Sequence, residues 1–208
     1  MYAILELQVN GDRRAVGIPA HYSLLEALRY GLGLTGSKQG CDKGDCGACT
    51  VLLDDVPVNS CILPAWEAEG HAVLTIEGVA STHGLHPLQE AFEITGGAQC
   101  GFCTPGILMA AYALLQHTTA PTRAEIKDAL SGNLCRCTGY TKIYDAVELA
   151  AERLREDSGT TAPRAPAAPA AAPRSREQIA VTPEPPRANP VPPGHSPPVV
   201  PAEKVHES

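Results

Sequence analysis

The sequence lacks several features by which common functional classes are identified. No stretch approaches the roughly 18 consecutive apolar residues of a membrane-spanning helix. Near the start, no basic region precedes an apolar core and a small-residue cleavage site. There is no G-x-S-x-G or P-loop motif, and the Asp and Glu residues show no paired spacing typical of acid–base catalysis. We therefore expect a cytoplasmic chain without a membrane span and without substrate chemistry of its own.

An excess of positive charge is absent as well. Sixteen Lys and Arg residues against 23 Asp and Glu residues give a formal net charge of −7. Residues 157–208 hold five basic and five acidic side chains, so this negative charge lies on residues 1–156. An acidic body argues against binding to nucleic acid.

Residues 157–208 differ in composition from the rest of the chain. They contain 13 of the 19 prolines, and alanine fills most of the gaps between them. Such a segment has little apolar surface to offset its ordering entropy, so it is predicted to be a disordered tail, partly polyproline II. The tail could be a flexible appendage, a docking arm for a partner or maturation factor, or a more specific anchor or linker.

Cysteine is the residue type that carries the chemistry. The eight cysteines form two sets of four, separated by a gap of nearly forty residues: Cys41, Cys46, Cys49 and Cys61, then Cys100, Cys103, Cys135 and Cys137. Four thiolates are the ligand set of an iron–sulfur cluster or a structural zinc ion. In a reducing compartment such sets are metal ligands rather than disulfides.

The first set has the spacing C-x4-C-x2-C, with a fourth cysteine twelve positions later. This is the plant-type [2Fe–2S] pattern, whereas zinc sites usually present two short C-x2-C pairs. Gly40, Gly44 and Gly47 allow positive φ, so the loop can curl with its N–H groups directed at a cluster. The spacing therefore favours [2Fe–2S] over zinc or a disulfide loop.

The residues around the first set predict a small sheet crossed by a helix. AILELQV and RRAVGI alternate on either side of an NGD turn, and Ser23 can cap a short helix, SLLEALRYGL, with Leu24, Leu25 and Leu28 on one face. TVLLDD, VPVNSC and AVLTIEG follow as three β-rich runs. The expected fold class is α+β, with a β-grasp ferredoxin-like domain over residues 1–78.

The second set predicts a four-helix domain over residues 79–156. Its cysteine pairs lie in QCGFCTPG and NLCRCTGY, each followed by a threonine and then by helical sequence. Thr104 can cap a helix that starts at Pro105, and Thr138 or Thr141 can cap one with an apolar stripe from Ile143. PLQEAFEI after His86, and TRAEIKDAL with a capping box at Thr122, predict the other two helices.

Two helix N-termini would then meet over one metal centre. Their positive dipole ends would stabilise the net charge of about −2 on a [2Fe–2S] tetrathiolate. A zinc tetrathiolate carries the same formal charge, so spacing and charge leave zinc open for this second set.

GCDKGDCGACTV, VNSC, QCGFCTPG and GNLCRCTGY, in this order, resemble the small iron–sulfur subunit of the molybdenum hydroxylases. This family includes xanthine dehydrogenase, carbon monoxide dehydrogenase and bacterial aromatic hydroxylases. The resemblance covers residues 3 to 153 and implies a β-grasp and a four-helix domain, each holding one [2Fe–2S] cluster. It also implies a large partner subunit with a molybdenum–pterin cofactor, usually a medium subunit with FAD, and a dimer of heterotrimers. The family offers no role for residues 157–208.

The resemblance assigns two positions besides the ligand roles. Gln99 matches a glutamine that hydrogen-bonds the pterin in the family, and the sulfur of Cys137 matches one that approaches the pterin amino group. Electrons would run from molybdenum through the second cysteine set to the first, and on to flavin.

Two other functions stay open at this point. One is a stand-alone two-cluster ferredoxin-type carrier, against which Gln99 and the helical domain argue. The other is a zinc-stapled interaction module with a proline-rich arm. The substrate of the complex cannot be identified from this chain.

Overall fold

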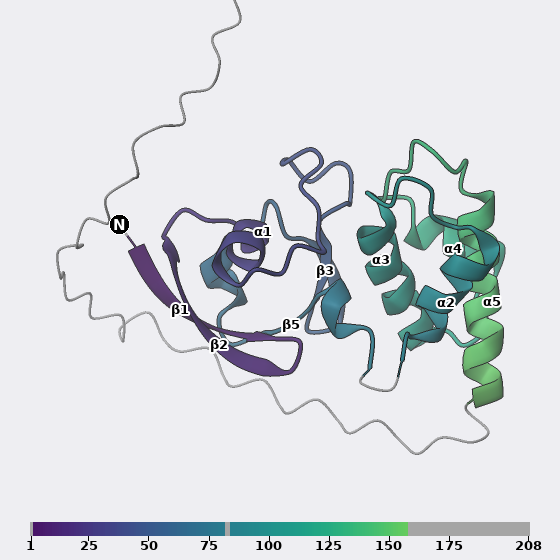
Figure 1. The fold of residues 1–208 in the computed structure, drawn as a ribbon, viewed down its shortest axis with the longest axis horizontal. Helices are drawn as coiled ribbons and strands as arrows, with labels where there is room; N and C mark the ends of the chain where they lie inside the picture. Colours follow the sequence, from purple (N-terminus) through teal and green to yellow (C-terminus); the bar gives the residue numbers. More distant parts are fainter. Residues whose placement is uncertain (1, 82–83, 158–208) are drawn as a thin grey trace, which may run out of the picture. The chain divides into compact units, whose positions relative to one another are not determined.

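The computed structural model describes residues 2–81 and 84–157 (Figure 1). The first half contains five strands, a short α-helix, a π-helical turn and 3-10 turns: β1 Tyr2–Val9, β2 Asp12–Pro19, α1 Leu24–Glu26, η1 Ala27–Gly31, β3 Thr50–Leu53, β4 Val56–Asn59, η2 Ala65–Ala68, β5 Ala72–Leu74 and η3 Ile76–Gly78. Four helices follow: α2 Pro87–Thr95, α3 Thr104–His117, α4 Arg123–Ala129 and α5 Thr141–Asp157. The expected mixture of a sheet and helices is confirmed. Apart from Asp157, the predicted tail lies outside the described residues.

The strands form one mixed sheet in the order β2-β1-β5-β3-β4. β1 and β5 are parallel, and the other neighbouring pairs are antiparallel. The β1–β2 hairpin closes on Asn10 and Gly11, which both have positive φ, as a two-residue turn with matching twist requires. The hairpin predicted from NGD is thus confirmed, with Asp12 already in the second strand.

The last predicted β-run is shorter than expected. β5 ends at Leu74, and Ile76–Gly78 form the 3-10 turn η3. The side chain of Asn10 explains the end of the strand, because its Oδ1 accepts the Thr75 N–H at 2.8 Å. That donor is therefore not used in the sheet.

The helix predicted at Ser23 is present, with a different ending. Ser23 and Glu26 form a reciprocal capping box, and α1 continues directly into the π-helical turn η1. Leu24 and Leu28 are fully buried in the core beneath the sheet. Leu25 packs against Cys49 and Cys61, so the helix also supports the first cysteine set.

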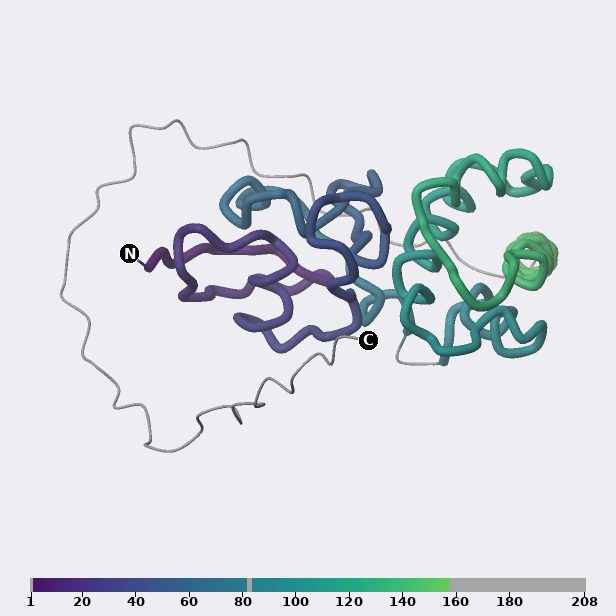
Figure 2. The backbone as a smooth tube through the Cα atoms, turned by 90° about the horizontal axis from the view of Figure 1, so that it is seen from above, coloured from purple at the N-terminus to yellow at the C-terminus, as the bar shows by residue number. Residues whose placement is uncertain are grey.

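The four later helices fill the second half of the described chain. α3 is buried over most of its length. α5 buries Ile143, Ala146, Val147 and Ala150 of its predicted stripe, and Leu154, the last member of that stripe, is half-buried against the same core. α2 begins at a His86–Gln89 capping box and α4 at a Thr122–Glu125 capping box. Both helix starts confirm the prediction. Figure 2 follows the path from the purple β1–β2 hairpin to the green α5.

The predicted starts of α3 and α5 are corrected. Cys103 is the N-cap of α3 but makes no capping hydrogen bond with its side chain, and Thr104 is the first helical residue. α5 begins at Thr141, and the Thr138 hydroxyl accepts the Tyr140 N–H and contacts the Cys135 sulfur. Thr138 therefore supports the cysteine segment, and Thr104 lies inside α3 instead of capping it.

The sheet and the helices share apolar core residues. Leu52 of β3 is fully buried within the cluster formed by α2, α3 and α5, and Leu74 and Ile76 pack against the same cluster. Among the helices that the structure describes, we find none with the length and apolar character needed to cross a membrane.

Candidate metal centres

The β3–β4 hairpin brings together two cysteines of the first set. Cys49 directly precedes β3, and one residue, Ser60, separates Cys61 from the end of β4. Thr50 and Asn59 are partners across the hairpin. Both cysteines are buried. The Ser60 hydroxyl donates to the Cys49 carbonyl oxygen at 2.6 Å and fixes this end of the hairpin.

The other two cysteines of the first set lie on a tightly curled loop. The N–H groups of Asp45 and Cys46 donate to Cys41 Sγ at 3.3 and 3.4 Å. Gly44 and Gly47 have the positive φ that the sequence suggested. Gly40 does not; it is needed for space, because a Cβ there would lie 2.8 Å from Cys46 Sγ.

The four thiols of the first set lie close enough to influence one another. Backbone hydrogen bonds from Lys43 and Cys46 lower the pKa of Cys41 to about 7. Burial, together with the Cys49 thiol, raises the pKa of Cys61 to about 12. Burial, and after it the Cys41 thiol, raises the pKa of Cys46. Cys41 and Cys46 lie together on the loop, and Cys49 and Cys61 lie together at one end of the β3–β4 hairpin.

The second set is also arranged as two pairs, each joining one cysteine from either motif. Cys137 Sγ and Cys100 Sγ are 3.6 Å apart, and both residues are exposed. Cys103 and Cys135 are half-buried, and burial together with the Cys135 thiol raises the pKa of Cys103 to about 12. Burial also raises the pKa of Cys135, but hydrogen bonds from Thr138 outweigh it and lower that pKa on balance.

The structure gives partial support for the helix-dipole prediction. α3 begins at Thr104, directly after its N-cap Cys103, so its N-terminus adjoins the second set. α5 begins four residues after Cys137, and its dipole's action on the same centre stays a prediction. Gln99 is exposed beside Cys100 in the chain, and the pterin contacts of Gln99 and Cys137 also stay predictions.

Pairs of thiols are the common element of both sites. Within residues 2–81 and 84–157, no three His, Cys, Asp or Glu side chains converge on a point suited to one metal ion. Two pairs per set suit a two-iron centre that takes two thiolates on each iron, for a total of four.

Sequence reasoning missed several residues that hold the two loops. Asn59 Nδ2 donates to the Gly44 carbonyl oxygen at 2.9 Å, and Cys49 Sγ lies 3.9 Å from Asn59 Oδ1. Asn133 and Tyr140 bond to backbone groups of the cysteine segments. Asn59 stands in VNSC and the other two in GNLCRCTGY, so the motifs contained these residues without indicating their partners.

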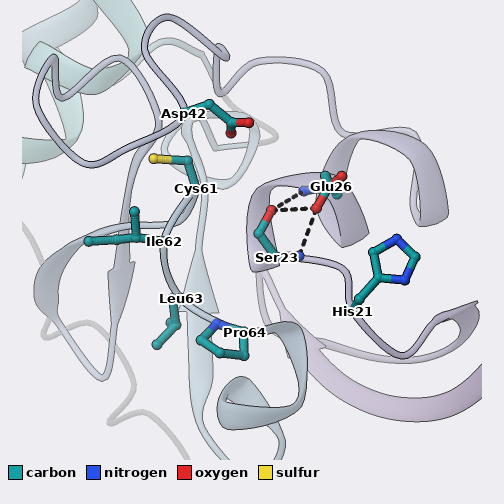
Figure 3. Close-up of a pocket in the computed structure, with 8 residues that line it drawn as sticks. All are labelled: His21, Ser23, Glu26, Asp42, Cys61, Ile62, Leu63 and Pro64. Carbon is teal, nitrogen blue, oxygen red and sulfur yellow. Dashed lines mark hydrogen bonds between the residues drawn. The ribbon is translucent and has the colours of Figure 1, made fainter.

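Cys61 also lines a shallow cavity of about 240 Å³ (Figure 3). Ile62, Leu63 and Pro64 continue its wall after the cysteine, and the Ser23–Glu26 capping box lies on another side. The first cysteine set therefore adjoins a hollow in the protein surface.

Comparisons with known proteins agree with this geometry. A family described as a 2Fe-2S iron-sulfur cluster binding domain matches residues 7–74, and one described as a [2Fe-2S] binding domain matches residues 75–148. The nicotinate dehydrogenase small FeS subunit of Eubacterium barkeri is 46% identical over 149 residues, covering 72% of this chain and 95% of that protein. The nicotine 6-hydroxylase small subunit of Paenarthrobacter nicotinovorans is 48% identical over 143 residues, covering 69% and 86%.

A solved structure extends the likeness to three dimensions. The crystal structure of quinoline 2-oxidoreductase from Pseudomonas putida 86 contains a chain that is 41% identical with a TM-score of 0.72, covering 74% of this chain and 97% of that one. Xanthine dehydrogenase 2 of Arabidopsis thaliana is 48% identical over 160 residues, which are 12% of its length. With its paired thiols and four ordered cysteine motifs, the chain belongs to the small [2Fe–2S] subunits of the molybdenum hydroxylase family.

Proposed function

We propose that this chain is the electron-transfer subunit of a multi-subunit molybdenum hydroxylase or dehydrogenase. It would hold one [2Fe–2S] cluster on Cys41, Cys46, Cys49 and Cys61, and a second on Cys100, Cys103, Cys135 and Cys137. Electrons would pass from a molybdenum–pterin site on a large subunit, through the second cluster and then the first, to FAD on a medium subunit or another acceptor. The observation that carries the proposal is that the fold gathers the eight thiols into two sets, the first by the curled loop and the β3–β4 hairpin, the second with the Cys100 and Cys137 sulfurs 3.6 Å apart.

The donor chemistry of the first site fits such a cluster. Ligation needs thiolates, and the hydrogen bonds that lower the pKa of Cys41 favour this form near neutral pH. Cys61 and Cys103 have raised pKa values, so their deprotonation would be coupled to metal binding. The cluster contributes reversible one-electron chemistry, and the protein contributes ligands, N–H donors and position.

Exposure supports the proposed order of the clusters. Gln99, Cys100 and Cys137 are all exposed, so the second site could face a partner that contributes a pterin. The first site adjoins the cavity beside Cys61, where a different partner could approach. The expected assembly remains a dimer of heterotrimers, and the expected location remains the cytoplasm.

The finer domain organisation belongs to the same proposal. We infer a β-grasp domain over residues 1–78 and a four-helix domain over residues 79–156. The mixed sheet with its parallel β1–β5 pair supports the first, and helices α2–α5 support the second. Residues 157–208 remain a predicted disordered tail, and truncation after Asp157 with assays of assembly and turnover would test a docking role.

Metal analysis tests the central claim. Iron and acid-labile sulfide are measured on anaerobically purified protein, and EPR spectra are recorded after dithionite reduction. We expect about four irons per chain and two distinct rhombic signals. The variants Cys46→Ser and Cys103→Ser should each remove one signal and retain the other. Bound zinc, or about two irons in the unaltered chain, would contradict the proposal.

A stand-alone electron carrier is the competing function. It differs in one measurable property, because an enzyme subunit should co-purify with a large molybdenum-containing chain under native conditions. Recovery of the iron-loaded chain alone from its native source, with no molybdenum in any fraction that contains it, would favour the carrier.

A further inference from the structure

The two cysteine segments meet through direct backbone contact. A Cβ on Gly106 of α3 would lie 2.1 Å from the carbonyl oxygen of Gly47, which belongs to the first cysteine loop. A Cβ on Gly47 would in turn lie 2.3 Å from the carbonyl oxygen of Gly132, just before the second cysteine pair. Because these distances leave no room for side chains, the segments approach as closely as main chains allow.

The side chain of Asn133 forms hydrogen bonds across this contact. Its side chain is 5% exposed, and its Nδ2 donates to the Gly47 carbonyl oxygen at 2.9 Å and to Thr50 Oγ1 at 3.2 Å. Thr50 Oγ1 donates to the same Gly47 oxygen at 2.7 Å. A buried amide with satisfied donors is directional, so it specifies one relative position of the groups that it joins.

The main chain at Asn133 is also tied to the second cysteine set, through the Tyr140 hydroxyl. The Tyr140 hydroxyl donates to the Asn133 carbonyl oxygen at 3.1 Å and accepts the Cys135 N–H at 2.8 Å. Tyr140 has a φ of 69°, which is uncommon for an aromatic residue and is maintained here by local bonding. Residues 133–135 are therefore tied to the first loop on one side and to Tyr140 on the other.

One peptide hydrogen bond then spans the two ligand sets. The N–H of Leu134 donates to the carbonyl oxygen of Cys46 at 2.9 Å. Cys46 belongs to the first set, and Leu134 is bonded directly to Cys135 of the second. The side chain of Asn133 lies one residue from this bond and holds the segment that forms it.

We propose that Asn133 is a positioning residue that fixes the separation and orientation of the two clusters through its bonds to Gly47 and Thr50. This inference rests on the proposed function, because it presumes a cluster in each cysteine set. The apolar contacts of Leu52 also join the two halves, but hydrophobic contact is non-directional and tolerates small displacements. Asn133 supplies a directional constraint beside the ligands and holds the segment that forms the Leu134–Cys46 hydrogen bond.

Magnetic coupling between the clusters tests this role. In fully reduced protein two paramagnetic clusters split each other's EPR signals, and the dipolar part of this splitting falls steeply with distance. We expect Asn133→Ala to retain about four irons and both signals. Its splitting should be smaller or more broadly distributed than that of the unaltered chain. An unchanged splitting would overturn the inference, whereas an unaltered chain without two signals would contradict the proposed function instead.

Asn10 provides a matched control. Its Nδ2 also donates to a threonine hydroxyl, Thr75 Oγ1 at 3.0 Å, but at the β1–β2 turn. Glycine tolerates the φ of 55° found there, so Asn10→Gly removes the side chain without opposing the turn. This variant should keep the original splitting, and an equal loss of splitting in both variants would overturn a specific role for Asn133.

A second variant and readout cover the case in which Asn133→Ala fails to fold. Tyr140→Phe removes only the hydroxyl between Asn133 and Cys135, and it should alter the splitting in the same direction. Hydrogen exchange by mass spectrometry on the iron-loaded chain reports the Leu134 N–H. We expect its exchange to rise about tenfold in either folded variant. Unchanged exchange and splitting in Tyr140→Phe would count against the inference.

Discussion

At the residue scale, Cys41 ionises more readily than Cys61 and Cys103. The pKa of Cys41 is lowered to about 7 by backbone hydrogen bonds, while burial raises those of Cys61 and Cys103 to about 12. Thiolates, rather than thiols, react with alkylating agents. The pattern of reactivity in metal-free protein is therefore predictable.

Alkylation of the metal-free chain should begin at Cys41. We expect its labelling by iodoacetamide to increase as the pH rises through about 7 and then level off, because the thiolate population follows that pKa. Cys61 and Cys103 should stay largely unlabelled across this range. Peptide mass spectrometry after a short pulse measures all three sites, and equal labelling would contradict the prediction.

Gly106→Ala should destabilise the protein despite the higher helix propensity of alanine. The new Cβ would lie 2.1 Å from the Gly47 carbonyl oxygen, and relief requires a backbone shift. We expect a loss of about 1–3 kcal/mol, measured by thermal unfolding. Gly17→Ala on β2 is the control, since its Cβ meets nothing within 4 Å. Equal stability of the two variants would exclude the close approach at Gly106.

At the element scale, the capping boxes of α2 and α4 show which helix starts depend on local sequence. The Thr122 hydroxyl accepts the Glu125 N–H, and the Glu125 carboxylate accepts from the Thr122 backbone and hydroxyl. These bonds lower the pKa of Glu125. The two partners of this cap, Thr122 and Glu125, lie within four residues of each other in the sequence.

Removal of this cap should have a measurable effect. Thr122→Ala is expected to cost about 1 kcal/mol of stability, because the first turn of α4 loses its side-chain acceptor. Urea denaturation of this variant is compared with that of Thr119→Ala, at an exposed position before the helix. A difference below about 0.3 kcal/mol between them would show that the cap contributes little to stability.

The same distinction explains how much could be predicted from sequence. Cysteine spacing identified both thiol sets, and capping patterns placed the starts of α2 and α4, because these signals lie within a few residues of their targets. The helices α3 and α5 begin within about one residue of a predicted start, but the caps proposed at Thr104 and Thr138 were wrong, because Cys103 is the N-cap of α3 and Thr138 bonds within the second cysteine segment. The bond from Asn133 to Gly47 joins residues 86 positions apart and depends on the assembled fold.

At the scale of the whole molecule, the shared core predicts joint unfolding of the sheet and the helices. Leu52→Ala removes a fully buried side chain of β3 from the helical cluster and should cost about 2–5 kcal/mol. Fluorescence of Trp66 in the first half and far-UV circular dichroism of the helices should report the same lowered guanidinium midpoint. Ile94→Ala, at a position 60% exposed, is the control. Two separate transitions in the unaltered chain would contradict a shared core.

Three exposed apolar side chains each adjoin a predicted ligand in the chain. Ile62 follows Cys61, Phe102 precedes Cys103, and Leu134 precedes Cys135, with exposed fractions of 60%, 47% and 58%. Exposed apolar side chains at these positions favour aggregation of a chain that lacks its partner. We expect recombinant yield of the soluble chain to rise on co-expression with a partner subunit.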